Sequence, residues 1–284
     1  MAAVAAVTIP PSAGLSVALL KRAATAVVGI PLFVWIVVGA PRVLFVLLVV
    51  ALSGVAAWEL MRMFERAGGR PYTRLAVVGA VAVTASFAVP GGRTFAALVL
   101  TLAVGAVLSA PVWRGEAVAV EPVAATMLAI VYVGWLLGHG LSFERLPDGG
   151  PLVLFLVGTT WAGESAAFGV GSLFGRHRLA PAISPRKTLE GAVGQLVVSV
   201  VAAAVLGAWL VPHWSVSTAI LAGAMLGIVG QIGDLTESAI KRSLGAKDTG
   251  TLIPGHGGVL DRLDGLMFNA PALFYYASWV GGRG

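Results

Sequence analysis

The chain has 284 residues, of which 58% are apolar and 11% charged, and its mean hydropathy is +0.91. Soluble domains carry about 25% charged residues, so this composition excludes an ordinary water-soluble fold. The net charge of +6 does not indicate a nucleic-acid partner, because the basic residues gather in loops expected on one side of a membrane. The absence of cysteine excludes disulfides, thiolate zinc sites and cysteine nucleophiles.

Apolar runs bounded by charge, proline or glycine predict an all-α polytopic membrane protein with about nine transmembrane helices. Such runs suit a hydrocarbon core of about 30 Å. The alternating pattern of an outer-membrane barrel is not found. The predicted spans are 24–40, 43–61, 75–91, 94–111, 122–141, 151–173, 191–212, 216–236 and 265–281.

The chain is predicted to form one integral membrane domain over residues 1–284, with N-terminal helices in 1–150 and a catalytic part in 151–284. If the N-terminus is cytoplasmic, fifteen of the nineteen Lys and Arg residues fall in cytoplasmic segments and four on the opposite side. This bias follows the positive-inside rule, and it places the loops 174–190 and 237–264 in the cytoplasm.

Charge is concentrated in the stretch 233–265. It holds five of the chain's 13 Asp and Glu, four of its 19 Lys and Arg and one of its four His. Charged side chains are costly in a bilayer, so a polytopic chain that gathers them in one place is expected to do its chemistry there.

Asp234, Glu237 and Lys241 lie at the end of a long apolar run, three and four residues apart. That spacing places them on or near one face of a helix. They could form a salt-bridged helix end. However, an acid costs on the order of 3 kcal/mol at mid-bilayer, so a carboxylate near the boundary usually has a cation to hold.

A basic and glycine-rich loop follows, and it ends in two further acids. In order, it contains Lys247, Asp248, Pro254, Gly255, His256, Gly257, Gly258, Asp261, Arg262 and Asp264. Glycines let a backbone approach a phosphate closely, and the two acids, three apart, are predicted to share a helical face. Taken singly, these features also occur in ordinary turns and helix starts. Together they suit a Mg²⁺–triphosphate complex.

The order and spacing of these residues resemble the signature of the phosphatidate cytidylyltransferases (CDP-diacylglycerol synthases). The resemblance covers about 27 residues, from Ser238 to Asp264. A second block, SPRKTLEG at 184–191, resembles the family's SPxKTxEG loop. The apolar spans fit the family's polytopic plan, and the N-terminal half is similar only in character.

Ser184, Lys187 and Thr188 of the second block precede a helix predicted to begin near Glu190. Their hydroxyl and ammonium groups could cap that helix or bind an anion at its N-terminus. Read alone, the block favours a cap. Beside the signature, it favours a role in binding nucleotide or lipid phosphate.

The resemblance implies an enzyme, a nucleotidyltransferase that transfers the cytidylyl group of CTP to phosphatidate and gives CDP-diacylglycerol and pyrophosphate in phospholipid biosynthesis. It implies a Mg²⁺ site held by Asp234, Asp261 and Asp264, and leaves a second cation open. The catalytic residues it implies are Asp234, Lys241, Arg242, Lys247, Asp248, His256, Asp261, Arg262 and Asp264. The substrate-binding residues it implies are Ser184, Lys187, Thr188, Glu237, Gly257 and Gly258.

Four further polar residues fall outside these motifs. Glu164 lies in the span 151–173, where the family usually has Asp. It is either a contact to metal or substrate or a buried acid bonded to a neighbouring helix. We expect Glu59 to be interfacial rather than catalytic, and His177 and His213 to be loop or interface residues.

The implied partners are CTP, phosphatidate and membrane lipid, with no nucleic acid, and a homodimer is one possible assembly. The implied location is the inner (plasma) membrane of a bacterial cell, with the active site facing the cytoplasm. The alternative functions are those of a polyprenol kinase, an archaeol-type cytidylyltransferase and a transporter. A transporter would spread charge through several spans. The DGxxAR-type motif of CDP-alcohol phosphotransferases is not found.

Overall fold

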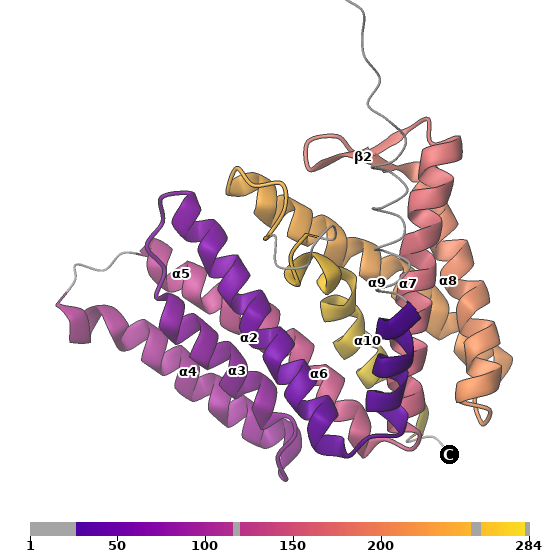
Figure 1. Cartoon of the computed structure of the whole chain (residues 1–284), viewed down its shortest axis with the longest axis horizontal. Coiled ribbons are helices and arrows are strands. Elements are labelled where there is room, and N and C mark those ends of the chain that lie inside the picture. Colours follow the sequence, from indigo (N-terminus) through magenta and orange to yellow (C-terminus); the bar gives the residue numbers. More distant parts are fainter. Residues whose placement is uncertain (1–26, 116–119, 251–256, 282–284) are drawn as a thin grey trace, which may run out of the picture.

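The structure is a computed structural model that describes residues 27–115, 120–250 and 257–281, and it is almost entirely helical (Figure 1). The first helix described is Val27–Val38. The elements that follow are α2 (Arg42–Arg66), α3 (Thr73–Ser86), α4 (Gly92–Arg114), α5 (Val120–Leu128), the π-helix η1 (Ala129–Trp135), α6 (Leu136–Ser142), the 3-10 turn η2 (Phe143–Arg145), α7 (Gly149–Phe174), β1 (Arg178–Ala180), β2 (Ser184–Thr188), α8 (Leu189–Leu210), α9 (Val216–Ser243), the 3-10 turn η3 (Leu260–Arg262) and α10 (Asp264–Gly281).

Six helical stretches within the described residues are long and apolar enough to cross a membrane. They are α2, α4, the continuous stretch Val120–Arg145, α7, α8 and α9. Val27–Val38 and α3 are apolar but shorter. Each predicted span overlaps a described helix, so the all-α membrane fold is confirmed. The count of nine crossings and the cytoplasmic N-terminus stay predictions.

The helices form two groups with α10 between them. Helix α10 packs against α6 of the first group and against α7 and α9 of the second (Figure 1). Small residues permit this close packing. A Cβ at Gly233 of α9 would lie 2.6 Å from the backbone oxygen of Asp264. The end of α9 and the start of α10 therefore meet, which brings distant parts of the signature together.

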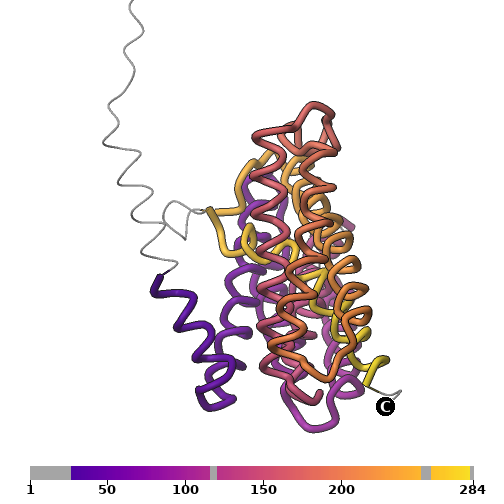
Figure 2. The backbone as a smooth tube through the Cα atoms, turned by 90° about the vertical axis from the view of Figure 1, so that its right-hand side faces the viewer, coloured from indigo at the N-terminus to yellow at the C-terminus, as the bar shows by residue number. Residues whose placement is uncertain are grey.

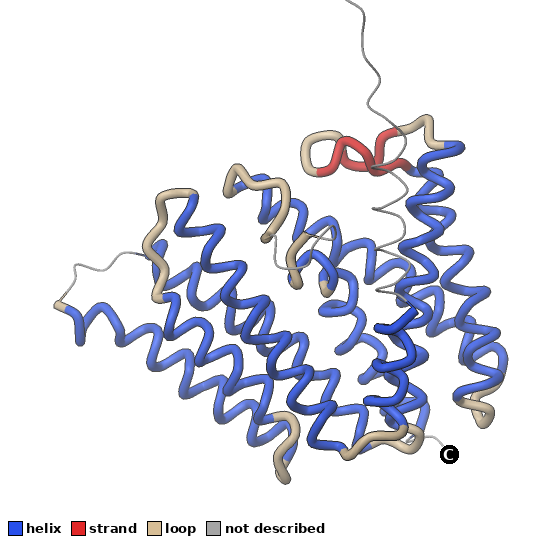
Figure 3. Tube along the Cα trace, in the orientation of Figure 1, coloured by secondary structure: helices blue, strands red, loops and turns tan. Residues whose placement is uncertain are grey.

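Strands β1 and β2 form an antiparallel hairpin between the last residue of α7 and the first of α8, where the sequence predicted only a loop (Figure 3). Arg178 pairs with Thr188, and Ala180 pairs with Ser184. Glu190 in the first turn of α8 contacts the residue just before β1, because its carboxylate lies 2.6 Å from Nδ1 of His177. This contact stabilises the base of the hairpin. The loop position predicted for His177 is confirmed.

The turn between α3 and α4 lies at the end of the bundle opposite the hairpin (Figure 2), and two basic residues expected on the non-cytoplasmic side, Arg42 and Arg145, bind it. Arg42 donates to the carbonyl of Ala88 at 3.1 Å, and Arg145 donates to that of Val89 at 2.9 Å. Arg42 also pairs with Glu144. Arg42 and Arg145 thus lie at one end of the bundle, as predicted, and the side of the membrane that this end faces stays a prediction.

Candidate active site

A cavity of about 660 Å³ lies between α7, α8, α9 and the hairpin. Its ionisable lining residues are Glu164, Arg178, Arg186, Lys187 and Asp234. Apolar and small residues of α7 and α8, such as Ala167, Phe168 and Gly171, line the rest. A polyanion and an apolar chain could therefore occupy the same space.

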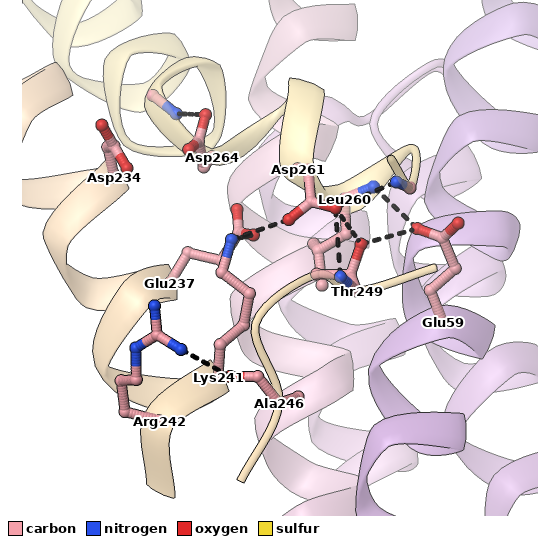
Figure 4. Close-up of polar contacts among 12 residues, drawn as sticks. Glu59, Asp234, Glu237, Lys241, Arg242, Ala246, Thr249, Leu260, Asp261 and Asp264 are labelled. Carbon is pink, nitrogen blue, oxygen red and sulfur yellow. Dashed lines mark hydrogen bonds and ion pairs between the residues drawn. The ribbon is translucent and has the colours of Figure 1, made fainter. Parts of the chain in front are cut away.

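Asp234 and Asp264 form a pair of acids beside this cavity (Figure 4). Oδ2 of Asp234 lies 2.7 Å from Nζ of Lys187, and Asp264 lies close enough to Asp234 for the two carboxyl groups to interact electrostatically. Oδ1 of Asp264 accepts a 2.8 Å hydrogen bond from the N–H of Gly265. Two carboxylates this close repel each other unless a cation or a proton lies between them. The pair is therefore a candidate cation site.

The side chain of Glu164, on α7, extends toward the acid pair of Asp234 and Asp264. A Cβ at residue 265 would clash with its Oε1, so Gly265 is what admits this side chain. Its charged neighbours include Asp264, Asp234, Arg262 and Lys187. Of the two readings left open by the sequence, this placement favours a contact with the site.

Asp261 does not join the acid pair. Its Oδ1 accepts from Nζ of Lys241 at 2.7 Å, and its Oδ2 accepts from the N–H of Thr249 at 3.0 Å and that of Gly258 at 2.9 Å (Figure 4). Burial acts to raise the pKa of Asp261, but these donors outweigh it and lower the pKa to about 2. The predicted face shared with Asp264 is not observed, because Asp261 lies in η3 and α10 begins only at Asp264.

Glu237 and Lys241 form a buried ion pair one turn beyond Asp234. Glu237 is 0% exposed, and its Oε1 lies 2.8 Å from Nζ of Lys241. The same ammonium binds Asp261. The salt-bridged helix end therefore describes Glu237 and Lys241, whereas Asp234 faces the cavity.

Three residues predicted to be catalytic lie elsewhere in the structure. Arg242 joins the hairpin to the loop after α9, because it donates to the carbonyls of Ile183 and Ala246, each at 3.2 Å. Lys247 and Asp248 line a second cavity of about 360 Å³ beside α2. Their roles as catalytic residues stay predictions.

The remaining predicted residues have mixed placements. Thr188 is the N-cap of α8, where its Oγ1 accepts from the N–H of Gly191 at 3.1 Å, and it also lines the larger cavity. Ser184 begins strand β2. Gly257 has a φ of +80°, which favours glycine. Arg262 is exposed and lies in electrostatic range of Glu164. His256 lies outside the described residues.

Sequence reasoning missed Arg178, Arg186 and Glu59. The two arginines line the larger cavity through the hairpin, whose strands of three and five residues are too short to give a pattern in the sequence. Glu59 was expected to be interfacial. It is 1% exposed, because it packs against the start of η3 and accepts a 2.9 Å hydrogen bond from the N–H of Leu260.

Residues 20–280 match the sequence profile of the Cytidylyltransferase family. The chain belongs to this family. The match covers both groups of helices, the hairpin and the signature, so the membership does not rest on the signature alone.

Several relatives share part of the chain. The uncharacterized protein YnbB of Escherichia coli (strain K12) is 42% identical over 151 residues, which are 53% of this chain and 50% of that protein. The phosphatidate cytidylyltransferase of a Synechocystis strain is 44% identical over 47% of this chain and 45% of its own length. That of Staphylococcus epidermidis is 37% identical over 52% and 56%. Each match spans about half the length of the relative.

Proposed function

We propose that this protein transfers the cytidylyl group of CTP to phosphatidate, giving CDP-diacylglycerol and pyrophosphate. The observation that carries the proposal is one cavity that joins an acid pair, basic side chains and apolar helix faces. Lys187, Arg178 and Arg186 suit phosphate oxygens, and the apolar walls suit a lipid. Phosphatidate cytidylyltransferases among the relatives support this choice of substrates.

In this reaction a phosphate oxygen of the lipid attacks the α-phosphorus of CTP. A new P–O bond forms, the bond from the α-phosphorus to the oxygen that bridges to the β-phosphorus breaks, and pyrophosphate leaves with that bonding electron pair. The attacking oxygen is already anionic at neutral pH, so no strong general base is needed. The protein's work is then to position two anions and to offset their charge. Lys187 is suited to this task because its ammonium already lies at the acid pair.

We propose that Asp234 and Asp264 hold the Mg²⁺ ion. Mg²⁺ prefers oxygen ligands, keeps several waters, and is usually held by one or two carboxylates together with substrate phosphates. No group of three or more His, Cys, Asp or Glu that could hold a metal occurs among the described residues, so a site built from two acids and substrate fits better than a closed protein cage. When bound, Mg²⁺ would neutralise charge on the phosphates.

Asp261, unlike Asp234 and Asp264, is not proposed as a ligand of this ion. Both of its oxygens are occupied by Lys241, Thr249 and Gly258, so it would have to give up a donor in order to bind a metal. We propose that its main role is to hold the signature loop and to fix Lys241 beside Glu237. A second cation stays open.

The distribution of basic residues supports an inner (plasma) membrane protein whose cavity faces the cytoplasm. CTP is found on that side, and the hairpin end carries the larger group of Lys and Arg. The substrate lipid would reach the same end from the bilayer.

The test uses CTP labelled at one phosphorus and the detergent-solubilised protein with added phosphatidate. Label at the α-phosphorus is expected to enter the lipid fraction, and label at the γ-phosphorus is expected to remain in pyrophosphate. Lipid labelled from the γ-position would instead show a kinase. No lipid label from either position would contradict the proposal.

A further inference from the structure

Glu59 of α2 is a buried acid that the reaction above does not use. Its carboxylate is 1% exposed. Its Oε2 accepts from the N–H of Leu260 at 2.9 Å and from the hydroxyl of Thr249 at 3.3 Å. Thr249 and Leu260 come 190 and 201 residues after Glu59, and they lie on either side of the glycines of the signature.

The backbone on both sides of the signature loop is shaped around this carboxylate. A Cβ at Gly250 would lie 2.7 Å from Oε1 of Glu59, and one at Gly258 would lie 2.6 Å from Oε2. Gly258 was predicted to let the backbone approach a phosphate. In the structure it gives the backbone room to approach Glu59.

The contact continues toward the acid pair through buried polar groups. The hydroxyl of Thr249, which is 1% exposed, lies 2.9 Å from Oδ2 of Asp261 and so stands between two carboxylates. Asp261 in turn binds Lys241, which binds Glu237 (Figure 4). A displacement at Glu59 can therefore reach α9, the helix that carries Asp234.

A purely packing role does not account for an acid at this position. A buried carboxylate costs several kcal/mol unless it is well paired, and an apolar residue of similar size would avoid that cost. Glu59 is held by an amide N–H and a hydroxyl, and its Oε1 has no hydrogen-bond partner among the described residues. The acid is explained if fixing Leu260 and Thr249 matters to the site.

We propose that Glu59 is a positioning residue for the cytidylyl transfer, through which the N-terminal helices fix both sides of the signature loop and, through Asp261, the place of Lys241. This inference rests on the proposed function. It assigns to the N-terminal half a direct part in shaping the site, although none of the motif residues lies there.

The first test compares turnover by Glu59→Ala and Glu59→Gln with that by Glu65→Ala, a control acid on the same helix. A misplaced site costs on the order of 10²-fold, so kcat of Glu59→Ala should fall by about that factor while KM for CTP changes little. Gln keeps one oxygen for both donors, so Glu59→Gln should stay within about tenfold of the unmodified chain. A folded Glu59→Ala protein with unchanged kcat would overturn the proposal.

The second test follows hydrogen exchange of the Leu260 amide in detergent, which does not require activity. Glu59→Ala should raise the exchange rate at Leu260, and Glu65→Ala should not. An unchanged exchange rate at Leu260 in folded Glu59→Ala would show that Glu59 does not hold the Leu260 amide, and this would overturn the proposal. If Glu59→Ala fails to fold, Thr249→Val removes the hydroxyl that stands between Glu59 and Asp261, leaves the backbone N–H bond to Asp261, and should lower kcat in the same direction. If the unmodified chain transfers no cytidylyl group, the proposed function fails, while the exchange rates still decide the contact.

Discussion

The acids of the signature fall into two groups with different partners. Asp234 and Asp264 face each other at the cavity, whereas Glu237 and Asp261 share the ammonium of Lys241. Like charges are costly together and opposite charges stabilise each other. In the second group the ammonium of Lys241 binds both acids, whereas in the first the described ion pair joins Lys187 to Asp234 and not to Asp264, so the first group is suited to bind an added cation.

Glu164 and Gly265 form a matched pair across α7 and α10, and this gives a prediction at the scale of one side chain. Gly265→Ala should push the Glu164 carboxylate away from the acid pair, because the new Cβ would clash with Oε1 of Glu164. Turnover should fall by about tenfold or more, since small displacements at a site are costly. Turnover of the purified protein with labelled CTP measures this.

The double variant Gly265→Ala with Glu164→Asp is the control, because Asp is one methylene shorter and leaves room for the methyl group. It should recover part of the lost turnover. The thermal stability of the single variant should not fall greatly, because Ala has a helix propensity about 1 kcal/mol more favourable than that of Gly. Full turnover by Gly265→Ala would show that the placement of Glu164 does not matter.

At the scale of elements, the hairpin supplies most of the positive charge at the cavity. Arg178→Ala and Arg186→Ala should each raise KM for CTP or phosphatidate by about tenfold, the loss expected for one charge-assisted hydrogen bond. Initial rates at varied concentrations of each substrate measure this. Arg176→Ala is the control, because the contact described for Arg176 is made by its backbone N–H to Glu190. Equal effects of all three substitutions would point to general charge rather than to the cavity.

The long helices were predictable from sequence, and the hairpin was not. Runs such as 151–173 and 216–236 coincide with α7 and α9, because burial in lipid requires apolar residues throughout a span. Strands of three and five residues give too few positions for an alternating pattern. Arg178 was missed for that reason.

The site was predictable as a set of residue types but not as a geometry. Spacing alone paired Asp261 with Asp264, but Asp261 lies in the 3-10 turn η3 and Asp264 begins α10, so they do not share a helical face. The contact of Glu59 with Leu260 joins residues 201 apart, and no local pattern in one sequence can reveal it. Motif residues therefore indicated where the chemistry is, and tertiary packing decided which of them face each other.

At the scale of the whole molecule, the orientation in the membrane can be tested by cysteine labelling. The natural chain has no cysteine, so each introduced thiol is unique. Ser243→Cys, near the hairpin end, should react with an impermeant thiol reagent only after cells are opened. His213, whose Nδ1 lies 3.1 Å from the Asp148 carboxylate, is at the opposite end, and His213→Cys should react in intact cells. The reverse pattern would contradict a cytoplasmic cavity.

The acid pair of Asp234 and Asp264 beside the cavity is the proposed centre of the reaction. The most direct measurement is transfer of α-phosphorus label from CTP to phosphatidate by Asp264→Asn, compared with Asp148→Asn at the far end of the bundle. We predict that Asp264→Asn loses transfer by about 10²-fold or more, as removal of a charge-stabilising group does, while the protein stays folded in detergent and Asp148→Asn is unaffected. Undiminished transfer by folded Asp264→Asn would contradict the account.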